Sequence, residues 1–127
     1  MSLGASLRHS FRRYVRLPCE VVREHDFRLI GDLALDLSTR GMLVRARQPV
    51  LTGEEVVVAF QGPRSNVWFD AIGTVARVLH GRRPGDGGVC LGIEFHDVAP
   101  DLERLLFAQL QGRSAPEPMR ARRILAA

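Results

Sequence analysis

Apolar and polar residues alternate with a period of two along most of the chain, which is the pattern of half-buried β-strands. The clearest example runs from Phe27 to Ser38. Its apolar positions on one side are Phe27, Leu29, Leu33, Leu35 and Leu37. If these side chains point inward, Asp36 and Ser38 point outward together and form a small exposed ledge.

Five further strands follow from the same criteria. One opens at Leu17, and the others are predicted at 42–47, 54–61, 68–80 and 89–95, separated by turns rich in glycine and proline. Gly73, inside the 68–80 segment, predicts a bend or bulge.

Near the C-terminus the period changes to 3.6. A helix is predicted after a start signal at 97–101, and its apolar residues are Leu102, Leu105, Leu106 and Leu110. Six short strands without βαβ alternation favour an all-β fold with one C-terminal helix. We expect a six-stranded antiparallel β-barrel, with the helix covering one open side.

Charge divides the 127 residues into three parts. Residues 1–16 carry a charge of +4, residues 17–111 carry −3 and residues 112–127 carry +3. The composition, 46% hydrophobic, suits one domain with a single core. We therefore expect a flexible basic arm at 1–16, the barrel and helix at 17–111, and a disordered basic tail at 112–127. All 18 basic residues are arginine, which reflects codon bias and says nothing about function.

The cysteines and the longest apolar runs limit the cellular context. Cys19 and Cys90 stand singly in alternating stretches, with no CxxC pair and no secretory segment, so both are expected in the core of a cytoplasmic protein. No apolar run approaches the ~18 residues of a membrane span. The residues Met1-Ser2-Leu3 are consistent with a cloning remnant.

Two polar clusters carry the candidate chemistry. Arg12 and Arg16 are four residues apart, so both can reach one ligand while Arg13 points elsewhere. Guanidinium groups bind phosphate oxygens and the O6 and N7 edge of guanine. The opposite guanine edge presents N1–H and N2–H donors, which the carboxylate of Asp36 can accept. The two clusters together indicate a ligand that contains guanine and phosphate.

These clusters resemble the signature of the PilZ domain family, an RxxxR followed by [DN]xSxxG. The matching residues are Arg12, Arg16, Asp36, Ser38 and Gly41, and 91–95 is similar to the closing strand of the family. The resemblance covers residues 8–111 and implies a PilZ-type β-barrel that binds cyclic di-GMP between the arm and the outer face of the barrel.

The resemblance also implies a role for each matching residue. Arg12 and Arg16 would contact phosphate and guanine with help from Arg13. Asp36 and Ser38 would bind the guanine edge, and Gly41 would leave room for the ligand. Some family members stack an aromatic residue at the end of the fifth strand. Here that region holds Leu79 and His80, so His80 is the candidate additional contact.

Alternative interpretations remain open from the sequence. The arginines also suit a solvated basic arm, and Asp36, Ser38 and Gly41 also suit a turn that caps its own backbone. A small barrel that binds single-stranded nucleic acid, or a protein-interaction module, is the alternative function, although the body is net negative with few aromatics. No catalytic constellation or metal-ligand spacing is evident. A receptor of this size is expected to act through a downstream protein partner.

Overall fold

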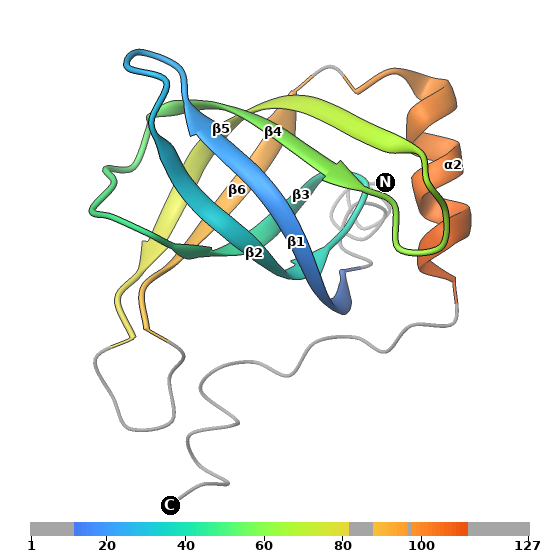
Figure 1. The fold of residues 1–127 in the computed structure, drawn as a ribbon, viewed down its shortest axis with the longest axis horizontal. Coiled ribbons are helices and arrows are strands. Elements are labelled where there is room, and N and C mark those ends of the chain that lie inside the picture. Colours follow the sequence, from blue (N-terminus) through green and yellow to red (C-terminus); the bar gives the residue numbers. More distant parts are fainter. Residues whose placement is uncertain (1–11, 82–87, 97, 112–127) are drawn as a thin grey trace, which may run out of the picture.

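The computed structural model describes residues 12–81, 88–96 and 98–111, which form six strands and one helix (Figure 1). The elements are β1 (Arg13–Arg23), β2 (Leu29–Leu37), β3 (Gly41–Ala46), β4 (Glu55–Gln61), β5 (Trp68–Leu79), β6 (Cys90–His96) and α2 (Pro100–Leu110).

The strands form a closed antiparallel barrel in the order β1-β2-β3-β6-β5-β4. β1 closes it by pairing with β2 on one side and with β4 on the other. Closure leaves no exposed strand edge, so every strand finds its hydrogen-bond partners within the barrel. The predicted fold, a six-stranded antiparallel barrel with one C-terminal helix, is confirmed.

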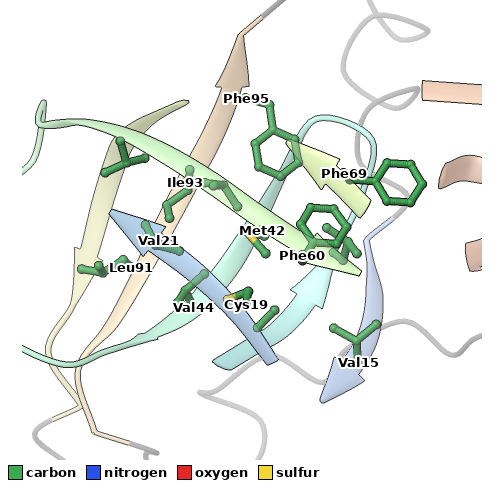
Figure 2. Packing of buried hydrophobic residues seen from close by; sticks show 14 of the residues in the cluster. Val15, Cys19, Val21, Met42, Val44, Phe60, Phe69, Leu91, Ile93 and Phe95 are labelled. Atoms are coloured by element: carbon green, nitrogen blue, oxygen red, sulfur yellow. The ribbon is translucent and has the colours of Figure 1, made fainter. Parts of the chain in front are cut away.

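The core fills the interior of the barrel with side chains from all six strands (Figure 2). Phe60 and Phe69 stack with their ring centroids 5.4 Å apart, next to the helix end of the barrel. Cys19 belongs to this core, and both cysteines are buried free thiols. Alternating burial along β4, where Val56, Val58 and Phe60 point inward, follows the period of two in the sequence.

The helix α2 covers one side of the barrel and is attached to the turn between β4 and β5 (Figure 1). Leu106 and Leu110 reach the core. The Gln109 side chain is buried and bonds to the turn through both of its polar atoms: Oε1 accepts from the Arg64 backbone N–H at 3.2 Å, and Nε2 donates to Ser65 Oγ at 2.9 Å. Within the described residues, no helix is long and apolar enough to cross a membrane.

The predicted inward face of β2 was largely wrong. Phe27 is 80% exposed and Leu29 is 39% exposed, while the core residues are Ile30, Ala34 and Leu37. The pairing of β2 with β3 shifts register twice, between Gly31 and Leu33 and between Ala34 and Asp36. The core positions change parity between Ala34 and Leu37, across the second shift, so a simple period of two does not persist along the strand.

The start of β1 and the position of the irregularity in β5 also differ from the prediction. β1 begins at Arg13 and not at Leu17, so Arg13 and Arg16 lie within the first strand. The irregularity expected at Gly73 lies between Val75 and Arg77. Gly73 instead faces the backbone of β6, where a Cβ would approach the Glu94 carbonyl oxygen to 2.8 Å.

Candidate functional site

The structure brings the two halves of the sequence motif together at the start of β1. The Arg12 guanidinium donates to Asp36 Oδ1 through Nε at 3.1 Å and approaches the same oxygen through a terminal nitrogen at 2.8 Å. Arg12 lies one residue before β1, and Tyr14 pairs directly with Asp36 across β1 and β2. The pairing of these strands therefore places the arginine and the carboxylate in contact, although they are 24 residues apart in the sequence.

Asp36 is buried, contrary to the exposed ledge predicted from the sequence. Its residue surface is only 3% exposed because Arg12 and the neighbouring strands cover it. Burial raises the pKa of this carboxyl above 3.8, and the nearby Arg12 guanidinium and a hydrogen bond from the Leu43 backbone N–H partly offset that rise. The N–H of Leu43 donates to Oδ1 at 3.1 Å. Each of these contacts is made to Oδ1 and none to Oδ2.

Ser38 is also buried, with 4% of its surface exposed, and its hydroxyl closes its own turn. Oγ accepts from the backbone N–H groups of Arg40 at 3.0 Å and Gly41 at 3.2 Å, and it lies 3.4 Å from the Gly41 carbonyl oxygen. A hydroxyl offers one donor and two acceptor positions, so these contacts use its full capacity. The predicted exposure of Ser38 was wrong, and the geometry favours the turn-capping alternative for this residue.

Gly41 is required by strand packing. A Cβ at this position would overlap the Ile93 carbonyl oxygen, because β6 passes directly against the start of β3. The backbone of Gly41 is not in the left-handed region. The space beside this glycine is therefore occupied by β6 of the same chain.

The remaining arginines of the motif lie on or next to β1. Tyr14 and Arg16 are exposed, and Val15 between them is buried, so Tyr14 and Arg16 face outward on the same side. Within the described part of the chain, the Arg16 side chain takes part in no ion pair. Arg13 is half-buried and already engaged in a contact. The part of the predicted flexible arm that precedes residue 12, and the predicted basic tail, lie outside the described residues.

His80 follows the end of β5 and is exposed. No hydrogen bond or ion pair found among the described residues joins it to Arg12 or Asp36. Its assignment as an additional contact stays a prediction.

Two outward side chains near Asp36 were missed by the sequence reasoning. Tyr14, 45% exposed, presents an aromatic ring between the two arginines of the motif. Arg77 lies across Gly92 on the outer face, and its charge helps to lower the pKa of Asp36 against the larger effect of burial. Tyr14 was visible inside the RxxxR motif, whereas nothing in the sequence linked Arg77 to Asp36.

Two other kinds of site depend on metal-ligating residues or on a reactive thiol. The described residues contain no group of three or more His, Cys, Asp or Glu residues arranged to hold a metal ion. Burial raises the pKa of the Cys19 thiol to about 12, which leaves it protonated and a poor nucleophile at neutral pH.

A family model described as the PilZ domain matches residues 6–112. The chain belongs to the PilZ domain family. Its fold is similar to the PilZ domain of YcgR from Escherichia coli, solved with c-di-GMP, with a TM-score of 0.63 and 19% identity, over 79% of this chain and 86% of that chain. It is also similar to the Bacillus subtilis inhibitor of motility MotI/DgrA, with a TM-score of 0.63 and 16% identity.

The alignment with MotI/DgrA covers 76% of this chain but only 46% of the Bacillus chain. Both identities are low, so these two similarities establish the fold of this PilZ domain and not its ligand. A search of the curated proteins found no match.

Proposed function

We propose that this PilZ domain is a receptor for cyclic di-GMP. The observation that supports the proposal most directly is the Arg12–Asp36 ion pair, because it joins the arginine motif and the carboxylate motif at one place on the barrel. Membership of the PilZ family and the c-di-GMP in the E. coli YcgR domain support the same ligand. The family comprises binding and effector domains, so we propose no catalytic role.

Ligand binding exchanges the partners of Asp36. The N1–H and N2–H donors of a guanine replace the guanidinium of Arg12 at the carboxylate. Arg12 is then released to donate to phosphate oxygens or to the O6 and N7 edge of guanine, together with Arg16. Because the folded protein already holds Asp36 in an ion pair, a charged acceptor is in place before the ligand arrives.

Tyr14 adds a further contact in this proposal. Tyr14 is 45% exposed and lies between Arg12 and Arg16 in the sequence, on the outer side of β1. Aromatic faces stack on nucleic-acid bases with little dependence on base identity. Tyr14 can therefore supply the stacking surface that some PilZ domains take from the end of the fifth strand.

The signal passes to a partner protein through the segment that carries Arg12. When Arg12 leaves Asp36 and binds the ligand, the residues before β1 become ordered against the barrel, so ligand occupancy changes the surface that a partner meets. The partner remains unidentified, and we place the receptor in the cytoplasm, where the second messenger would be available.

The test is calorimetric titration of cyclic di-GMP into the wild-type protein and into Arg16→Ala and Asp36→Ala. Each substitution is expected to weaken binding by more than about ten-fold, because a charge-assisted contact contributes at least ~1.4 kcal/mol. Arg104→Ala is the matched control, since Arg104 is a 74% exposed arginine side chain on α2, and its affinity should equal that of the wild type.

A random single-stranded oligonucleotide serves as the competing ligand in the same titration. Absence of saturable cyclic di-GMP binding by the folded wild type would remove the proposed function. Tight binding of the oligonucleotide in its place would support the nucleic-acid alternative. Conversion of cyclic di-GMP to another product during the incubation would show an enzyme.

A further inference from the structure

An apolar strip runs across the outer wall of the barrel, away from the Arg12–Asp36 pair. Leu29, Val22, Val57 and Ile72 pair directly with one another across four neighbouring strands, β2, β1, β4 and β5. Leu29 and Val57 are 39% exposed and Ile72 is 53% exposed. Each of them has a sequence neighbour that belongs to the core or packs against it, so these four side chains share the outward face; these neighbours are Val21, Ile30, Val56, Val58 and Ala71.

Phe27 precedes Leu29, the end of the strip, by two residues and lies in the turn between β1 and β2. Its side chain is 80% exposed, and its backbone has a φ of 57°, a left-handed conformation that costs free energy for a residue with a bulky side chain. The turn is held firmly, because Asp26 accepts two hydrogen bonds from the Arg23 guanidinium and one from the Arg28 backbone N–H. The strained Phe27 is therefore exposed to solvent in a turn that these hydrogen bonds stabilise.

Carboxylates border the middle of this strip on both sides, and the one exposed arginine between Phe27 and Leu29, Arg28, is paired with Asp26. All three carboxylates lie on the outward face of the barrel. Glu20 and Asp70 lie on one side of the strip, two residues from Val22 and Ile72, and Glu55 lies on the opposite side, two residues from Val57. Among the described residues, none of these three carboxylates forms an ion pair with a basic group. Their charge is available for basic groups on another molecule.

We infer that Phe27, Leu29, Val22, Val57 and Ile72 form a docking surface for a protein partner that presents an apolar patch bordered by lysine or arginine. Burial of the strip and of Phe27 supplies the apolar contact, and Glu20, Glu55 and Asp70 supply the complementary charge. The carboxylate border disfavours an anionic membrane surface as the occupant, because like charges repel.

The docking surface is separate from the proposed ligand site. The turn that carries Phe27 follows the end of β1, whereas Arg12 precedes its beginning, and the two ends of this strand lie far apart in the molecule (Figure 1). A partner on the strip and a ligand at Asp36 can therefore be bound at the same time. The inference does not depend on the identity of the ligand.

The partner can be identified by photo-crosslinking. The full chain with p-benzoylphenylalanine in place of Phe27 is expressed in its source cells and irradiated, and the crosslinked protein is identified by mass spectrometry. That protein is then purified and titrated with the wild type, Phe27→Asn and Ile72→Thr. Each variant should weaken binding by about ten-fold or more, as truncation of an interface hot spot does.

Phe107→Gln is the matched control, since Phe107 is a 48% exposed aromatic residue on α2 and not on the strip. It should bind the partner within about two-fold of the wild type. The crosslinked segment of the partner should contain lysine or arginine. Thermal unfolding of each variant verifies that it is folded.

Several results would overturn the inference. These are the absence of a crosslinked partner, crosslinks to residues 112–127 or to a second copy of this chain, and crosslinks to lipid. Equal affinity of the wild type and the two strip variants for the purified partner, or an acidic crosslinked segment, would overturn it too. None of these results bears on cyclic di-GMP binding, which is measured separately.

Discussion

Arg12 and Asp36 form an ion pair of 2.8 Å in which the carboxylate is almost fully covered and the arginine side chain remains 32% exposed. The pair is asymmetric, because the carboxylate bears most of the cost of burial while the arginine keeps contact with water. An exposed cation can exchange this partner for a ligand more easily than a buried one. The asymmetry therefore suits Arg12 as the moving part and Asp36 as the fixed part of the proposed site.

The first prediction concerns the effect of pH on Asp36→Asn. The pKa of Asp36 is raised in the folded protein, so its contribution to stability is present at low pH and is lost as pH rises from 3.8 through the raised pKa. Asparagine does not ionise and can still accept from the Leu43 N–H. The free energy of unfolding of Asp36→Asn, relative to wild type, should therefore increase as pH rises through that range.

Urea unfolding of both proteins at a series of pH values measures this difference. A difference that stays constant, or that falls as pH rises, would mean that the pKa of Asp36 is not raised by folding. Because the family motif accepts asparagine at this position, Asp36→Asn tests stability, and Asp36→Ala remains the test of ligand binding.

The second prediction separates the packing role of Gly41 from a role in ligand binding. Gly41→Ala should lower the free energy of unfolding by about 1–3 kcal/mol without any ligand, because its Cβ would overlap the backbone of β6. Gly92→Ala is the matched control, since the three atoms nearest to its Cβ would all belong to the flexible Arg77 side chain, with Nε 3.1 Å away. A Gly41→Ala protein as stable as Gly92→Ala would show that β6 can move away.

The elements of this fold follow from the sequence pattern, but the direction of individual side chains in β2 does not. The strands and the helix were predictable because alternation and helical spacing persist over several residues. The two register shifts in β2 were not, because an inserted residue in one strand reverses the side-chain pattern without a residue type that marks it. Three other deviations have local causes: Asp36 is covered by Arg12, Ser38 caps its own turn, and Phe27 lies in the turn before β2 with a positive φ.

The motif itself was predictable from the sequence, but the contacts that its residues make were predictable only in part. The sequence placed Arg12 and Asp36 in one site, and the structure has them in contact. It could not show that the Ser38 hydroxyl would be fully engaged by its own turn, since this depends on the path of three consecutive residues. Nor could it relate Arg77 to Asp36, because that depends on the order of β3, β6 and β5 in the barrel.

The third prediction concerns the reactivity of Cys19. A rise in its pKa from 9.0 to about 12 lowers the thiolate fraction at neutral pH by about a thousand-fold, and the side chain is also buried. Iodoacetamide should therefore leave Cys19 unmodified in the folded protein and modify it rapidly in denaturant, as measured by peptide mass spectrometry. Rapid alkylation of Cys19 under native conditions would contradict its placement in the core.

The last prediction concerns the backbone strain at Phe27. Asparagine adopts the left-handed conformation more readily than other residues with a Cβ, because its short polar side chain can bond locally. Phe27→Asn should therefore be more stable than Phe27→Ala by about 1 kcal/mol, since alanine removes the same ring but keeps the strain. Urea unfolding of the two variants measures the difference, and equal stabilities would show that φ at this position relaxes in solution. If Phe27→Asn has a higher free energy of unfolding than the wild type but binds the partner more weakly, the wild-type phenylalanine contributes to binding and lowers the stability of the fold.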